Sequence, residues 1–117
     1  MTVNTAYFFE VTLPYYIERH LFIFNLNKGR IHFIVGTEEW TIVFGDVAKP
    51  ILRGLRGWPD LALRFTPEAF VEFCQGDLDE RKALREKTVE VRGEHSLIGQ
   101  LWALFSPPPF KAPLGLG

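Results

Sequence analysis

The sequence predicts an α+β domain in which helices cover one face of a largely antiparallel sheet. Short strands and helices are mixed without the regular strand–helix alternation of a parallel sheet. Residues 30–36 and 39–45 each alternate two sets of side chains and are joined by residues 36–38, a pattern typical of a hairpin. Wide apolar helical faces occur in three further segments, Tyr7–Leu13, Ala69–Cys74 and Leu97–Phe105.

Length and composition predict one globular domain, residues 1–105, followed by a Pro/Gly-rich C-terminal tail, residues 106–117. The chain is 47% hydrophobic and 15% aromatic, so either its core is bulky or part of the aromatic surface lines a cavity. A net charge of -1 gives no excess of basic residues for binding nucleic acid. The single cysteine excludes an internal disulfide and permits a reducing compartment, and we expect a cytoplasmic protein.

The N-terminal segment is expected to belong to the fold. Its apolar residues from Asn4 to Leu13 recur at helical spacing, and Pro14 predicts a break or a second short helix through about His20. Interrupting charges and the lack of a basic leader favour neither a signal peptide nor a membrane span. Residues 21–26 are apolar on both faces and fit either a buried strand or a buried helical turn.

The middle of the chain combines weak and strong local signals. Residues 46–59 contain several Gly and Pro and predict a short, imperfect helix or a loop. Residues 60–65 alternate as a strand. Thr66 then caps a helix that begins at Pro67, and Gly76 is expected to end that helix in a left-handed conformation.

The last third predicts a helix, a strand and a helix. Residues 77–86 are dense in charge and are expected to form a helix on the surface. Residues 88–92 alternate valine with charged side chains, as in a strand with one solvated face. Residues 94–105 return to an apolar helical pattern, and the tail should be an extended, polyproline-like chain.

No catalytic or metal-binding motif is present in the sequence. It has no glycine-rich phosphate loop and no dinucleotide fingerprint. His20, His32 and His95 stand in different elements without ligands at suitable spacing, so neither a metal nor a cofactor is expected. Cys74 lies on an apolar helix face and is expected to be a buried, inert thiol. An enzyme is therefore the least favoured class.

Several segments in order resemble a known family. They are Asp60-Leu-Ala-Leu-Arg-Phe-Thr-Pro-Glu-Ala-Phe, Gln75-Gly-Asp-Leu-Asp, Val89-Glu-Val-Arg-Gly and the apolar run from Leu97 to Phe105. Together with the preceding hairpin, this order resembles the sterol carrier protein type two domain, over roughly residues 31–105. The resemblance implies a mixed sheet of about five strands covered by helices, with an apolar tunnel between them for sterols, fatty acyl chains or phospholipids. The chain departs from the family at residues 85–88, and its C-terminus is no peroxisomal address.

The predicted lining of this cavity is aromatic and aliphatic, although each of its side chains also fits ordinary core packing. It consists of Phe33, Trp40, Ile42, Phe44, Phe70, Phe73, Leu101, Trp102 and Phe105. Gln75 and Gln100 are the nearby polar groups that could orient a headgroup. Lys49, Arg53 and Arg56 form a local cationic segment that could attract a carboxylate, a phosphate or an anionic membrane surface, or could be an ordinary solvated loop.

Two classes of function remain open. The first is non-enzymatic binding or transfer of hydrophobic ligands, because each buried methylene contributes ~0.8 kcal/mol without any polar contact. The second is a protein interaction or dimerisation module, including a homodimer, which would use the N-terminal aromatics or the Pro-rich tail. An apolar cavity favours the first class, and a filled core with an exposed apolar patch favours the second.

Overall fold

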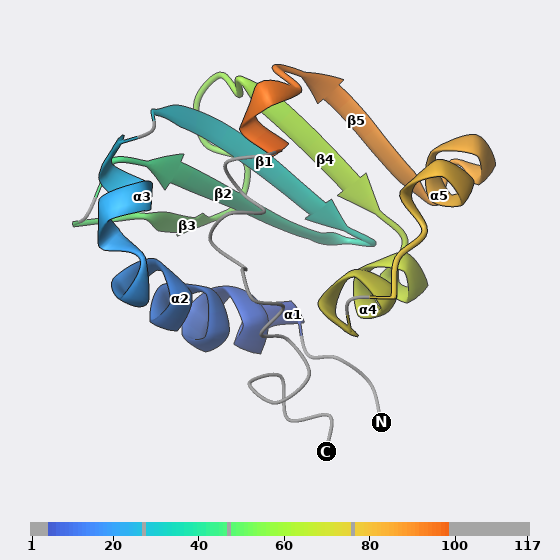
Figure 1. Ribbon diagram of the computed structural model, residues 1–117, viewed down its shortest axis with the longest axis horizontal. Helices are drawn as coiled ribbons and strands as arrows, with labels where there is room; N and C mark the ends of the chain where they lie inside the picture. Colours follow the sequence, from blue (N-terminus) through green and yellow to red (C-terminus); the bar gives the residue numbers. More distant parts are fainter. Residues whose placement is uncertain (1–4, 27, 47, 76, 99–117) are drawn as a thin grey trace.

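The computed structural model describes residues 5–26, 28–46, 48–75 and 77–98, and these form one five-stranded sheet with helices (Figure 1). The strand order is β3-β2-β1-β4-β5. The strands are β1 (Gly29–Val35), β2 (Glu38–Phe44), β3 (Ile51–Arg53), β4 (Leu61–Phe65) and β5 (Val89–Gly93). The predicted α+β class and the mixed sheet are thereby confirmed.

The predicted hairpin is confirmed as the antiparallel pair β1–β2, in which Phe33 lies opposite Trp40. Gly36 opens the turn with φ 60°, a left-handed conformation that costs glycine little. The other edge of β1 pairs in parallel with β4, and Phe33 there faces Leu63. Since β2–β3 and β4–β5 are antiparallel, β1–β4 is the parallel pair of this sheet.

The prediction of a helix or loop for residues 46–59 is wrong at residues 51–53, which form β3. This strand pairs with the outer edge of β2, where Ile51 faces Ile42 and Arg53 faces Trp40. Three residues are too few to show an alternating pattern. The free hydrogen-bonding edge of β2 therefore determines the conformation of this segment.

Of the two outcomes predicted at Pro14, the second short helix is confirmed, and the N-terminal segment runs into it without a break. It runs from α1 (Thr5–Tyr7) through the π-helix η1 (Phe8–Thr12) into α2 (Leu13–Arg19). The amide of Leu13 donates to the carbonyl of Phe8, five residues earlier. This wider turn leads directly to Pro14, which stands in the first turn of α2, where its missing N–H is tolerated. The ambiguous residues 21–26 form the helix α3 (Leu21–Leu26).

Both predicted helices between β4 and β5 are present, and the first begins where predicted, whereas the second begins at Glu80 rather than at residue 77. Thr66 caps α4 (Pro67–Gln75), since its hydroxyl accepts a 3.1 Å bond from the amide of Ala69. The charged helix is α5 (Glu80–Glu86), which is capped by Asp79. The predicted stop at Gly76 lies outside the described residues. The last predicted helix is described only over residues 96–98, and the tail is not described.

The helices cover one face of the sheet, as predicted. Figure 1 shows α1, α2, α3 and α4 on the same side of it, and α5 beside one end of β5. The strand residues that face these helices are nearly all buried, including Ile31, Phe33, Trp40, Leu63 and Phe65. In the described part of the chain, no helix is long and apolar enough to span a membrane.

Candidate functional site

An aromatic cluster joins the sheet to the helices. The ring of Phe9 stacks on Trp40 with centroids 5.0 Å apart, and it contacts Phe33 at 5.3 Å and Phe70 at 6.1 Å. Phe8 lies edge-on against Phe70 at 5.2 Å. Three of the predicted lining residues are therefore brought together, and the side chains that join them come from η1.

The other predicted lining residues are also in the core or lie outside the described part. Ile42 and Phe44 are buried, and Phe44 stacks on Phe24 of α3 at 5.2 Å. Phe73 is buried beside Phe70 at 5.9 Å. Leu101, Trp102 and Phe105 are not among the described residues. A ligand-lining role for this set stays a prediction, because these rings pack on other side chains.

An apolar pocket of about 60 Å³ lies next to this cluster, between the β4–β5 end of the sheet and α5. Its wall is formed by Leu63, Phe65, Leu78, Glu80, Leu84, Val89, Val91 and Ile98. Leu84 is 49% exposed, so the α5 side of the pocket borders on solvent. Glu80 is the one charged residue of this wall. The pocket therefore suits an apolar group inserted from the α5 side.

Phe65 separates the pocket from the aromatic cluster. One side of its ring belongs to the pocket wall. The ring also stacks on Phe33 at 5.6 Å with planes inclined by 3°, and it contacts Phe70 at 5.6 Å and Phe73 at 5.3 Å. Phe65 is therefore shared by the pocket wall and the aromatic cluster.

A larger hollow of about 470 Å³ lies on the opposite face of the sheet. It is lined by Ile34, Ala62, Leu63, Arg64, Glu90 and Arg92. Arg64 and Arg92 are exposed, so charged groups dominate its rim. Despite its smaller volume, the pocket beside α5 is the better candidate for an apolar ligand, because an apolar ligand gains little beside charged side chains.

The polar groups near Trp40 have an unusual arrangement. The indole Nε1 of Trp40 is buried and has no hydrogen-bond acceptor among the residues that the structure describes. The guanidinium of Arg53 lies 4.7 Å from the ring centroid and pairs with Glu10 at 3.1 Å and Glu38 at 3.5 Å. Because both ion pairs are exposed, they add little stability. They do occupy Arg53, which the sequence suggested as an attractor of anions.

The remaining chemically notable residues show no catalytic arrangement. Cys74 is fully buried, and burial raises the pKa of its thiol far above the ordinary value, so it stays protonated. His32 packs on the outer face of the sheet, with Nε2 3.2 Å from the carbonyl of Arg56. Gln75 is half-buried, and Gln100 is outside the described part. Within the described ranges, no three His, Cys, Asp or Glu residues are placed to hold a metal ion.

The pocket residues of α5 and its approach belong to a segment that was predicted as a charged surface helix. Leu78 and Leu84 are, with Ala83, the few residues of that segment that the sequence offers for burial. Large apolar side chains in an otherwise charged helix were therefore the signal for this wall. Val89 and Val91 were predicted correctly to face inward, but nothing local indicates that α5 stands far enough from them to leave a pocket.

No protein-family model and no curated protein sequence matches this chain. Its structure is similar to the solution structure of the sterol carrier protein domain 2 of Helicoverpa armigera. The TM-score is 0.65 at 18% identity, over 89% of this chain and 91% of that chain. It is also similar to Aedes aegypti sterol carrier protein 2 in complex with palmitate, with TM-score 0.62 and 15% identity over 80% and 87% of the two chains.

A third similar structure is that of UbiJ, a ubiquinone synthesis protein with a domain of the same type. Its TM-score is 0.62 at 16% identity, over 81% of this chain and 87% of that chain. These similarities extend over most of the chain. The family resemblance predicted from the sequence is thus confirmed at the level of the fold.

Proposed function

We propose that this chain, which has the sterol carrier protein type two fold, binds and transfers apolar small molecules without changing them chemically. The observation that carries the proposal is the apolar pocket between β4, β5 and α5, which reaches the aromatic cluster through Phe65. Fatty acyl chains are the ligands that fit it best. The solved complex of the Aedes aegypti protein with palmitate supports this choice.

The apolar wall supplies the driving force for such a ligand. Each methylene group moved from water into the pocket contributes ~0.8 kcal/mol, so a long acyl chain needs no polar contact. The pocket of about 60 Å³ holds only the end of such a chain. Ligand sites are typically roughly 300–1,000 Å³, so binding requires side chains to move outward.

The outer wall of the pocket is the part best suited to move. Leu84 is half in solvent, and α5 is a seven-residue helix with one buried residue, Ala83. Displacing such a helix exposes little apolar surface, whereas displacing a strand would break the sheet. We therefore expect the acyl chain to enter between α5 and β5 and its end to lie against Phe65.

The chemistry of the pocket supports a carrier rather than an enzyme. Its one charged wall residue, Glu80, is exposed, and the thiol of Cys74, which is not part of the wall, is buried and protonated. Neither group is arranged beside a partner that would activate it. A cytoplasmic location remains part of the proposal, since it suits a chain with one reduced cysteine.

Native mass spectrometry tests the proposal directly. The delipidated protein is mixed with palmitate, and we expect a species with one bound palmitate. A second fatty acid of different mass should displace it. A Phe65→Trp variant gives the site its own fluorophore, whose emission should shift on binding. Absence of a bound species at excess palmitate, with unchanged emission from Phe65→Trp, would refute the proposal.

A second candidate is an interaction module, and the exposed side chains of the N-terminal helices favour it. Val11 and Tyr15 lie one helical turn apart and are each 48% exposed, and Phe22 of α3 is 75% exposed. Exposed apolar residues in such numbers are typical of contact surfaces. Sedimentation equilibrium distinguishes this function, because a homodimer through this surface would dissociate in a Tyr15→Glu, Phe22→Glu variant.

A further inference from the structure

The loop between β3 and β4 presents an aromatic side chain almost entirely to solvent. Trp58 is 93% exposed, although indole is among the largest apolar groups that a protein can bury. The loop passes over the face of the sheet opposite the helices, where it covers the side chains of His32 and Thr41. Trp58 therefore projects from the molecule without any part of the core to pack on.

The backbone that carries Trp58 is tied firmly to the sheet. The buried hydroxyl of Thr41 donates to the carbonyl of Gly54 at 2.7 Å and accepts from the amide of Arg56 at 2.9 Å. The carbonyl of Arg56 accepts from the guanidinium of Arg30 at 2.8 Å. Three buried or half-buried strand side chains, those of Arg30, His32 and Thr41, thus hold a loop whose next residues are exposed. These hydrogen bonds fix the loop backbone and so keep Trp58 exposed.

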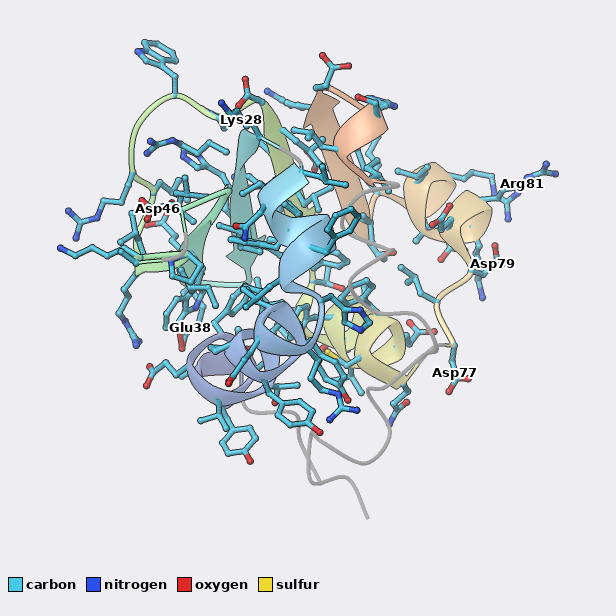
Figure 2. The ribbon with its side chains drawn as sticks, turned by 60° about the vertical axis from the view of Figure 1, so that its left-hand side comes forward. Lys28, Glu38, Asp46, Asp77, Asp79 and Arg81 are labelled. Atoms are coloured by element: carbon cyan, nitrogen blue, oxygen red, sulfur yellow. The ribbon has the colours of Figure 1, made fainter. Side chains whose placement is uncertain are left out.

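Cationic residues flank the part of the loop that carries this aromatic side chain. The guanidinium of Arg30 lies so close to Gly57 that any side chain at that position would collide with it. Arg56 is exposed beside it, and Figure 2 shows Lys28 at the same end of the molecule. Two carboxylates belong to this region: Asp60 accepts from the backbone amide of Arg30 at 2.8 Å, and the exposed Glu94 donates its amide to the carbonyl of Asp60 at 2.7 Å. The three cations therefore outnumber the two carboxylates.

The acidic partners of the neighbouring Arg53 lie elsewhere. Arg53 pairs with Glu10 of η1 and Glu38 of β2. Figure 2 shows Glu38 well away from Lys28, toward the N-terminal helices. Lys28, Arg30 and Arg56 therefore outweigh Asp60 and Glu94 in the electrostatic potential around Trp58, which attracts anions.

We propose that Trp58, with Lys28, Arg30 and Arg56, docks this protein on the surface of an anionic bilayer. The inference rests on the proposed function, because a carrier must meet the membrane that holds its ligand. Indole prefers the headgroup level of a bilayer, where its ring is half-solvated, and cations beside it pair with anionic lipids. A protein partner would instead need a contiguous apolar patch, and Leu55, at 38% exposed, is the only large apolar neighbour in this loop.

Vesicle flotation tests this docking surface. The protein is mixed with phosphatidylcholine vesicles made with and without phosphatidylserine, and we expect it to float only with the anionic ones. Trp58→Ala should weaken this partitioning about tenfold, and Arg56→Gln about fivefold, as loss of one cation predicts. Phe22→Ala is the matched control, because it removes another exposed aromatic ring from a different surface. Each variant should keep the thermal midpoint of the parent chain.

The two proposals fail in different ways. Palmitate uptake in the absence of vesicles should be the same for Trp58→Ala and the parent chain, because Trp58 is remote from the pocket wall. If the parent chain takes up palmitate but ignores anionic vesicles, the docking surface is wrong and the carrier proposal stands. Equal flotation of Trp58→Ala and the parent chain, or loss of flotation in Phe22→Ala instead, would likewise overturn the docking surface.

Discussion

The ring of Phe9 lies nearly flat on the indole of Trp40, with centroids 5.0 Å apart and planes inclined by 11°. Phe9 belongs to η1 and Trp40 to β2, so this stack links the N-terminal helices to the sheet. Both residues are almost completely buried. The position of Phe9 also depends on the π-helix, because one residue more or less in that turn would point the ring elsewhere.

Phe9→Ala should lower the free energy of unfolding by about 3–5 kcal/mol, because it leaves a cavity between η1 and β2. Guanidinium denaturation followed by circular dichroism measures this loss. Val11→Ala, at an exposed position of the same helix, is the control and should cost no more than about 0.5 kcal/mol. A cost of Phe9→Ala equal to that of Val11→Ala would show that the stack does not stabilise the fold.

Leu84→Arg should weaken palmitate binding at least about tenfold, or about 1.4 kcal/mol, because it places a charge at the open side of the pocket. Displacement of a fluorescent fatty acid measures the affinity. Leu55→Arg alters a residue of lower exposure outside the pocket and should bind like the parent chain. Equal affinities of the two variants would move the ligand site away from α5.

Alkaline pH should destabilise the parent chain more than Cys74→Ala. Burial raises the pKa of the Cys74 thiol above its ordinary value of 9.0, so the unfolded chain releases this proton first. The contribution of the thiol is complete below that ordinary value and declines as the pH rises above it. Between pH 8 and pH 10 the parent chain should lose about 1.4 kcal/mol more than the variant. Denaturation curves at both pH values check this, and parallel losses would contradict it.

Thr66→Ala should cost about 1 kcal/mol of stability, because it removes the hydroxyl that accepts from the amide of Ala69 at the start of α4. Thr66→Ser keeps an acceptor at the same place and should retain most of that energy. The denaturation midpoints of the two variants, compared with that of the parent chain, measure the contribution of the cap. If the serine variant is as unstable as the alanine variant, the lost methyl group rather than the cap is responsible.

Local signals in the sequence were enough to predict the hairpin β1–β2 and the capped helix α4. Alternation and a cap each involve residues that are adjacent or three apart. The strand β3 could not be predicted in this way, since it depends on an edge of β2 that lies nine or more residues away. The π-helix before Pro14 was missed because the sequence pattern of a helix does not distinguish four-residue from five-residue hydrogen bonding.

The sequence predicted which aromatic side chains lie together, and a ligand-lining role for them stays a prediction. Phe33, Trp40 and Phe70 do meet on the inner face of the sheet, as their spacing indicated. The apolar pocket, however, lies on the far side of Phe65, which stacks on Phe33. Where a pocket remains depends on how closely α5 approaches β5, which is a property of packing that no single segment encodes.

The parallel pairing of β1 with β4 sets an order for assembly during synthesis. β2 follows β1 after two turn residues, whereas β4 begins only at Leu61. One edge of β1 therefore stays unpaired until the twenty-five intervening residues, 36–60, have been synthesised. Contacts over such a separation form late and slowly. We therefore expect the β1–β2–β3 meander to appear first as a nascent intermediate, with an unpaired strand edge that chaperones can recognise until β4 arrives.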